Sequence, residues 1–197
     1  PLPPYIRNGQ MVDRDAESYQ TVYAKQPGSL AAPTAGLHFT TDLIRHLQQK
    51  GVSTASVVLH VGLGTFRPVS AARLSEHLMH SEWAELPETT AEKLRKCRSQ
   101  QGRVVAVGTT SVRVLESAAQ ATGSPYQAWS GQTNIFIRPP YQFLAMDALM
   151  TNFHLPKSTL LALVCAFAGR ELVMDAYHQA IEQKYRFYSY GDCMLIV

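Results

Sequence analysis

The sequence predicts an α/β domain in which a mixed sheet is flanked by helices. Three observations predict it. Short runs rich in β-branched residues alternate with amphipathic stretches, as expected when strands alternate with helices. A chain of 197 residues is long enough to bury most of its apolar surface in one core. Apolar residues make up 46% of it and charged residues 17%, a balance typical of globular proteins. We therefore expect residues 1–197 to form a single domain.

The first third of the chain gives few strong signals. Residues 1–30 are Pro-rich and polar, so we expect an irregular N-terminal segment with a short helix near Ala16–Ala24. Thr41 is a suitable N-cap for the next helix, which carries a narrow apolar stripe and ends at Gly51. The β-branched residues of Ser56–Val61 predict a strand.

The middle of the chain alternates more clearly. Pro87–Gln101 is amphipathic and stops before a glycine, which predicts a helix. Arg103–Val107 is a short apolar strand, and a helix over Thr110–Ala121 follows it. Two further strands, Asn134–Arg138 and Phe143–Met150, are predicted on either side of a Pro-Pro turn.

The last third predicts two helices and a strand. Pro156 suits the first turn of a helix that runs to Ala168. That helix is apolar on nearly every side, so we expect it to be buried. A second helix covers Glu171–Lys184, and Met194–Val197 reads as a terminal strand.

Composition excludes several classes of protein. Cys97, Cys165 and Cys193 are odd in number and widely spaced, which argues against a disulfide framework and a thiolate metal site. The longest apolar run, Leu160–Ala168, is far shorter than the roughly 20 residues that span a bilayer. We therefore expect a cytoplasmic protein without a membrane partner. The net charge of +3 permits a polyanionic partner but does not require one.

Three segments each place one histidine beside small or hydroxyl-bearing residues. Glycine lets the backbone approach a ligand closely, and Thr and Asn add hydrogen-bonding groups. Histidine transfers protons near neutral pH. The segments therefore predict the walls of one polar pocket. Its candidate residues are Thr34, His38, His60, Gly62, Gly64, Thr65, Asn152 and His154.

A strand, a tight turn and a helix start meet at Gly108. The residues that follow, Thr109, Thr110 and Ser111, offer free N–H groups and hydroxyls, which attract a carboxylate or phosphate. A capped helix without a ligand explains the pattern equally well. Arg113 would strengthen an anion site, or would simply pair with Glu116 three residues later.

Two other motifs are weaker. The spacing His77-x-x-His80-x-Glu82 could suit a metal, although such a pair of histidines more often faces solvent, and we expect no metal site. Gly62-x-Gly64 fails as a dinucleotide fingerprint because Arg67 stands where the third glycine belongs. The chain has no Gly-x-Ser-x-Gly elbow, which argues against a serine hydrolase.

Aromatic and charged residues are concentrated near the C-terminus. Tyr188 and Tyr190 offer ring faces, and Arg186 offers a guanidinium, for stacking on a base or holding a cation. Packing against the core is the commoner fate of such rings. Arg186 and Asp192 within this apolar stretch favour the ligand-binding interpretation.

Six blocks of the sequence, in order, resemble one enzyme family. They are AAPTAGLHF, LHVGLGTF, HLMHSE, VAVGTTSVRVLESAA, TNFHLPKSTL and YRFYSYGD. Together they closely resemble the S-adenosylmethionine:tRNA ribosyltransferase-isomerases of the queuosine pathway, and the resemblance covers nearly all of this chain.

The resemblance implies a cytoplasmic, monomeric enzyme that uses S-adenosylmethionine and no metal. Its partner would be a tRNA that carries 7-aminomethyl-7-deazaguanine at the wobble position. The family transfers and isomerises the ribosyl part of S-adenosylmethionine, which gives epoxyqueuosine and releases adenine and methionine. The implied fold joins an α/β main domain to a small inserted β-barrel.

The chain departs from the family pattern in two ways. The barrel and the N-terminal part of the family have no counterpart here, so we expect the chain to correspond to the C-terminal part and to be poorly active alone. Arg138-Pro139-Pro140-Tyr141 also stands where the family usually has a Pro-Gly turn.

The family reaction assigns roles to the candidate residues. A base must remove a proton next to the sulfonium, and a proton donor must assist adenine release, so His60, His154 and His38 are the catalytic candidates, with His80 behind them. The methionine carboxylate would be held by Thr109, Thr110, Ser111 and Arg113. Two rival functions remain at this level: a metal-dependent hydrolase that uses His38, His60, His80 and Glu82, and a non-catalytic RNA-binding protein.

Overall fold

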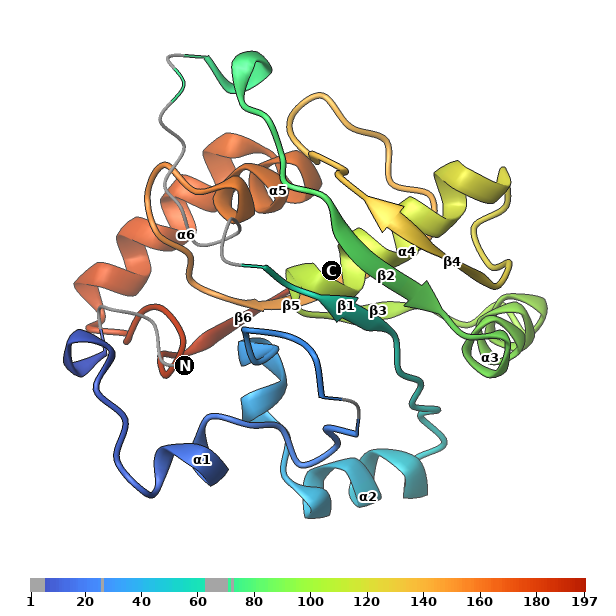
Figure 1. Cartoon of the computed structure of the whole chain (residues 1–197), viewed down its shortest axis with the longest axis horizontal. Coiled ribbons are helices and arrows are strands. Elements are labelled where there is room, and N and C mark those ends of the chain that lie inside the picture. The colour runs from blue at the N-terminus through green and yellow to red at the C-terminus, as the bar shows by residue number, and fades with distance from the viewer. Residues whose placement is uncertain (1–5, 26, 63–70, 72) are drawn as a thin grey trace.

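Two three-stranded sheets and the helix between them form the centre of the molecule. The computed structural model describes residues 6–25, 27–62, 71 and 73–197. Helix α4 (Thr109–Thr122) contacts strands of both sheets and is buried over residues 112–119 (Figure 1). The predicted α/β class is confirmed, but the single mixed sheet is divided in two. Helix α4 is buried over most of its length because strands of both sheets cover it.

The first sheet has the order β1-β2-β4 and is antiparallel throughout. It consists of β1 (Val58–His60), β2 (Glu82–Leu86) and β4 (Trp129–Thr133). The predicted strand at Asn134–Arg138 is wrong, because β4 lies just before it. Pairing of Trp129–Thr133 with β2 defines β4, although Ser130 and Gly131 give no strand signal in the sequence.

The second sheet has the order β3-β5-β6 and is mixed. Strand β3 (Val105–Val107) runs parallel to β5 (Ala148–Asn152), and β6 (Cys193–Ile196) runs antiparallel to β5. Because β5 begins at Ala148, the predicted strand at Phe143–Met150 starts five residues too early. Because β3 and β5 are parallel, their carboxyl ends meet at one edge, where ligands of open α/β sheets usually bind.

The other helices begin at recognisable caps. Helix α2 (Thr41–Gln49) is capped by Thr40, whose Oγ1 accepts from Leu43 N at 3.1 Å, one residue before the predicted cap. Helix α3 (Glu88–Ser99) follows Pro87. Helix α5 (Thr159–Ala168) begins after Ser158, whose hydroxyl accepts from Leu161 N, so Pro156 lies in the preceding turn and not in the helix.

The remaining elements are short or follow directly. Helix α6 (Arg170–Glu182) packs against α5. The N-terminal segment holds only η1 (Arg7–Gly9) and α1 (Asp15–Ser18), so the helix predicted at Ala16–Ala24 is much shorter than expected. Two more single turns are η2 (Thr34–His38) and η4 (Leu74–Glu76). Within the described residues no helix is long and apolar enough to cross a membrane.

The hydrophobic core joins both sheets. Its largest fully enclosed apolar side chains come from strand β2, from the loop after β4, from β5 and from α5: Leu86, Ile137, Leu149 and Leu163. Ile137 explains why the sequence after β4 looked like a strand, since an irregular segment buries an apolar residue there. Helix α5 is half-buried, less enclosed than its composition predicts.

Candidate active site

The carboxyl edge of β3 and β5 is the first part of the candidate site. Gly108 ends β3 with a φ of 85° and begins α4, and its N–H donates to Met150 O of β5 at 2.8 Å. A Cβ on Gly108 would stand 3.6 Å from the Ala35 side chain, so η2 lies directly against this turn. The first N–H groups of α4, at Thr109 and Thr110, have no acceptor within the helix.

Ser111 contributes less than its position suggests. Its hydroxyl donates to Val107 O at 2.8 Å, back to the end of β3. That bond uses the one donor of the side chain and holds the oxygen against the turn. Of the three residues predicted to bind an anion here, Thr109 is buried and Thr110 and Ser111 are half-buried.

Asn152 brings together three segments that lie far apart in the sequence. Its Nδ2 donates to Tyr188 O at 3.2 Å and lies 3.3 Å from Nε2 of His38. Since a main-chain carbonyl can only accept, the contact with Tyr188 fixes the orientation of the amide. Asn152 is 2% exposed, and its Oδ1 has no hydrogen-bond partner in the described structure. The end of β5, η2 and the C-terminal loop therefore meet at this side chain.

His154 lies just beyond β5 and is half-buried by its exposed surface. Its Nε2 is 2.8 Å from Thr151 Oγ1, and its main-chain N–H donates to the Tyr177 hydroxyl of α6 at 2.7 Å. Desolvation lowers the pKa of His154 to about 4. The ring is therefore neutral near pH 7 and can accept a proton or hydrogen bond but cannot act as an imidazolium acid.

His60 is held in the other sheet. It ends β1, and its ring packs edge-on against Trp83 of β2 with centroids 5.2 Å apart. The ring also fills the space where a side chain on Gly28 would stand. This stacking fixes the ring, and residue 60 remains half-buried.

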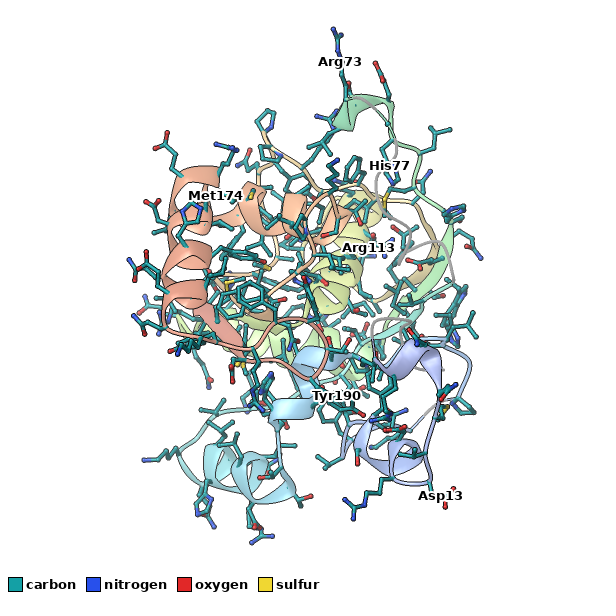
Figure 2. All side chains as sticks on the ribbon, turned by 90° about the vertical axis from the view of Figure 1, so that its left-hand side faces the viewer. Asp13, Arg73, His77, Arg113, Met174 and Tyr190 are labelled. Atoms are coloured by element: carbon teal, nitrogen blue, oxygen red, sulfur yellow. The ribbon has the colours of Figure 1, made fainter. Side chains whose placement is uncertain are left out.

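Arg113 is the most informative charged residue of the interior (Figure 2). It pairs through Nη1 with Glu82 of β2, and the Arg113 and Glu82 side chains are 4% and 2% exposed. Glu82 also accepts from Gly62 N at 2.9 Å, which ties α4 to the turn after β1. Among the described residues, Nε and Nη2 of Arg113 have no hydrogen-bond partner, although both atoms are buried.

The expected alternative, an Arg113–Glu116 pair, is wrong. Glu116 accepts from Leu144 N and Ala145 N at 3.0–3.1 Å and from the Tyr141 hydroxyl at 3.1 Å. Burial raises the pKa of Glu116, and the two main-chain donors partly oppose this. Glu116 therefore holds the loop after the cis Pro139-Pro140 bond, which leaves Glu82 to balance Arg113.

The C-terminal loop is closed on itself. Arg186 N donates to Asp192 Oδ2 at 2.7 Å, and the exposed Arg186 guanidinium reaches the same carboxylate at 3.5 Å. The main-chain donor lowers the pKa of Asp192 first, and the guanidinium adds to this. A Cβ on Gly191 would overlap the main chain of Arg186 and Phe187. Within this loop Tyr188 adopts a φ of 72°, which side chains rarely tolerate without support.

The remaining predicted residues are dispersed. Tyr190 packs edge-on against Tyr19 at 5.4 Å and is 39% exposed, so it lies at the surface and not in the core. Thr34 begins η2 and is half-buried, and His80 is exposed. Gly64 and Thr65 lie outside the described residues. In the described part of the chain no group of three His, Cys, Asp or Glu side chains is placed to hold a metal ion.

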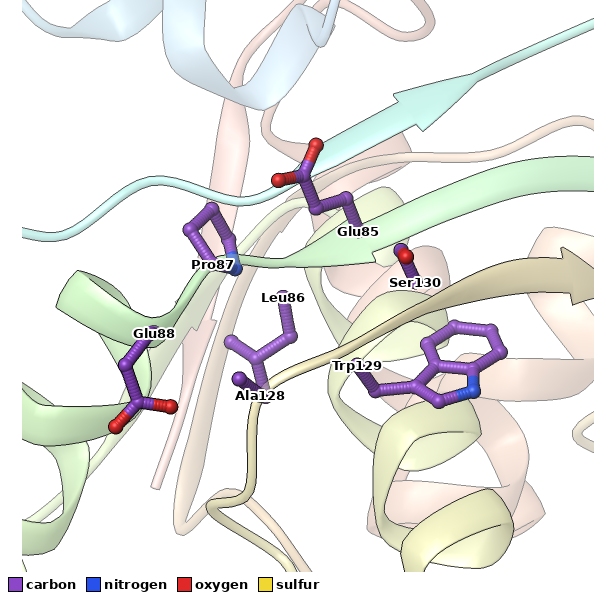
Figure 3. Close-up of a pocket in the computed structure, with 7 residues that line it drawn as sticks. All are labelled: Glu85, Leu86, Pro87, Glu88, Ala128, Trp129 and Ser130. Atoms are coloured by element: carbon purple, nitrogen blue, oxygen red, sulfur yellow. The ribbon is translucent and has the colours of Figure 1, made fainter.

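A separate hollow lies at the far end of β2 from Glu82. It has a volume of about 300 Å³ and lies between the end of β2, the start of α3 and the start of β4 (Figure 3). The Trp129 ring and the Glu85 and Glu88 carboxylates line it, together with Leu86, Pro87, Ala128 and Ser130. None of the predicted site residues lines this hollow.

Sequence reasoning missed two residues that support the site. Tyr177 lies in the middle of α6, where an aromatic residue at helical spacing predicts only core packing. Glu82 was considered only as a metal ligand, because nothing in the sequence links it to Arg113, 31 residues away. Both contacts are made across elements, and local patterns do not report them.

Comparison with known proteins shows the family of this chain. A solved structure described as an S-adenosylmethionine tRNA ribosyltransferase from Thermotoga maritima is similar to this chain, with 48% sequence identity and a TM-score of 0.69. The match covers 83% of this chain and 51% of that one, so the chain spans about half the length of this relative. The model of the family described as queuosine biosynthesis protein matches residues 1–196. The chain therefore belongs to the queuosine biosynthesis protein family.

Proposed function

We propose that this chain carries the S-adenosylmethionine-binding part of a tRNA ribosyltransferase-isomerase. The enzyme would transfer and isomerise the ribosyl moiety of S-adenosylmethionine onto 7-aminomethyl-7-deazaguanine at the wobble position of tRNA. The products would be epoxyqueuosine in tRNA, adenine and methionine. Family membership and the 48% identical relative support this proposal. We expect a monomer that acts in the cytoplasm, where tRNA is found.

The observation that carries the proposal is the open edge of the Arg113 guanidinium. Nε and Nη2 lie along one edge of the guanidinium, and their parallel N–H bonds match the two oxygens of a carboxylate. Within the part of the chain that the structure describes, these two charged donors are buried without an acceptor, which is costly, so this edge is suited to an anion. Glu82 holds the opposite side of the guanidinium and balances its charge. The α-carboxylate of methionine is the anion that S-adenosylmethionine would bring.

The start of α4 lies one helical turn before Arg113. Free N–H groups at Thr109 and Thr110 add positive potential on the same side of the sheet. Gly62, whose N–H is fixed by Glu82, would let the cofactor approach the turn after β1 closely, together with Gly64 and Thr65. These residues form our proposed cofactor cradle.

The histidines would divide the proton transfers. We assign His154 to proton acceptance, because a neutral, enclosed imidazole has a free lone pair at neutral pH. His60 is fixed by Trp83 and His38 touches Asn152, so either ring could donate to the leaving adenine or take the proton next to the sulfonium. Turnover of His60→Gln and His154→Gln would show which of these rings the reaction needs.

The tRNA side of the site would use the C-terminal loop. Tyr188 and Tyr190 offer ring faces for a base or the sulfonium, and Arg186 is exposed beside Asp192. Asn152 has a carbonyl oxygen still open to a donor. Thr34 would contribute a hydroxyl from η2.

The decisive assay is release of adenine from S-adenosylmethionine in the presence of tRNA that carries the aminomethyl base. The matched control is the same tRNA with unmodified guanine, which should give none. We expect slow turnover from the 197-residue chain and faster turnover from a chain extended at its N-terminus. Stoichiometric zinc or manganese in the purified protein would favour the metal-dependent hydrolase instead. Binding of tRNA without adenine release by either chain would favour the non-catalytic alternative.

A further inference from the structure

Tyr177 contacts two loops of the candidate site, the segment after β5 and the C-terminal loop. It lies in the middle of α6 and is 7% exposed. Its hydroxyl accepts the main-chain N–H of His154 at 2.7 Å. This donor lies two residues beyond the end of β5, so the hydroxyl satisfies a main-chain N–H outside the strand ladder and helps to hold the backbone at His154.

The Tyr177 ring contacts the same two loops. It packs edge-on against Phe153 and Phe187, with centroids 5.2 and 5.7 Å away. Phe153 and Phe187 also pack against each other at 4.8 Å. Phe153 lies between Asn152 and His154, and Phe187 lies between Arg186 and Tyr188. One aromatic cluster therefore supports residues from two segments more than thirty positions apart.

The two loops are also hydrogen-bonded to each other. Tyr188 N donates to Phe153 O at 3.1 Å, and the Asn152 amide donates to Tyr188 O at 3.2 Å. These bonds help to hold Tyr188 at its φ of 72°. A shift of Phe153 would therefore move Asn152, His154 and Tyr188 together.

We infer that Tyr177 is a positioning residue of the active site, which sets the His154 imidazole and the Asn152–Tyr188 contact in place. The inference rests on the proposed function, because it assigns these groups to catalysis. Burial raises the pKa of the Tyr177 hydroxyl to about 12, so it remains uncharged over the working range of pH. The hydroxyl therefore acts through geometry and transfers no proton to substrate.

The test is Tyr177→Phe, which keeps the ring and removes only the hydroxyl. Tyr126→Phe is a matched control, since Tyr126 is 8% exposed and its hydroxyl accepts from Arg98 Nε at 2.7 Å, away from the site. Tyr177→Phe should lower Tm by roughly 2–8 °C, because it loses one hydrogen bond. Tyr126→Phe should lower Tm by at least as much, because the Tyr126 hydroxyl also donates to Ala145 O at 3.4 Å. Only Tyr177→Phe should lower kcat, by about tenfold or more, with the KM for S-adenosylmethionine within about twofold.

A second measurement does not depend on turnover. In an NMR titration, the His154 ring should change its chemical shift and titrate at higher pH in Tyr177→Phe, because a loosened loop admits water. Tyr126→Phe should leave this titration unchanged. An unaltered His154 titration in Tyr177→Phe would overturn the inference, as would wild-type kcat per folded molecule. Absence of adenine release from the N-terminally extended wild type would refute the proposed function, and the titration would still test the positioning role.

Discussion

Replacement of Arg113 by lysine separates its two roles in this structure. The side chain pairs with Glu82 through Nη1, and among the described residues its buried Nε and Nη2 have no hydrogen-bond partner. Arg113→Lys retains a cation for Glu82 but removes the two parallel donors. Arg113→Ala is less informative, because it strands the buried Glu82 carboxylate at a cost of about 3–5 kcal/mol.

The expected loss of affinity follows from the donors removed. A hydrogen bond to a charged group contributes about 1.5–3 kcal/mol, so S-adenosylmethionine should bind about 10- to 150-fold more weakly to Arg113→Lys. Calorimetry measures this directly. The same titration with 5′-methylthioadenosine, which lacks the amino-acid end, should show no loss, because that ligand has no carboxylate to bind.

A matched substitution controls for general damage. Arg98 also pairs with a carboxylate, since its Nη2 donates to Asp147 at 2.8 Å, and its Nε donates to the Tyr126 hydroxyl. The two nitrogens that lack a partner in Arg113 are therefore both hydrogen-bonded in Arg98. Arg98→Lys should reduce stability without changing affinity for S-adenosylmethionine. Equal affinity of Arg113→Lys and wild type would refute the carboxylate assignment, and an equal loss for 5′-methylthioadenosine would show that the defect is structural.

Three other predictions concern the histidines and the C-terminal loop. In the N-terminally extended enzyme, His60→Gln and His154→Gln should each reduce turnover by about 10²–10⁴-fold while the protein stays folded, and full turnover in both would contradict a histidine mechanism. The lowered pKa of His154, about 4 against 6.5, means that the unfolded chain binds the proton more tightly. Wild type should therefore lose up to about 3 kcal/mol of stability relative to His154→Gln as the pH falls from 6.5 to 4. Urea unfolding of both proteins at each pH measures this loss. Parallel plots of stability against pH would argue against a desolvated His154 ring. Gly191→Ala should force the loop open, since its Cβ would overlap the main chain of residues 186 and 187. Proteolysis within residues 185–192 should become faster than in Gly123→Ala, where the φ of 70° disfavours a side chain but the new Cβ meets open space. Equal cleavage rates would show that the loop tolerates the change.

The sequence by itself determined the class of fold and most of its elements. The helices at α3, α4 and α6 and the strands at β1, β3 and β6 lie within a few residues of their predicted bounds. Their signals are local: caps, glycines after the last turn and β-branched runs act within a few residues of the chain. The six family blocks also led to the family, because long ordered motifs carry far more information than composition does.

Only the tertiary structure decided how these elements share the site. Strand β4 exists through its pairing with β2, although Trp129–Thr133 has little strand propensity of its own. Arg113 selects Glu82 over its helical neighbour Glu116, because Glu116 already accepts main-chain donors from the loop at 144 and 145. His154 has its lowered pKa because β5, α6 and their neighbours exclude water from the ring. Each of these properties depends on burial and on contacts between distant segments, which a residue acquires only when the whole chain has folded.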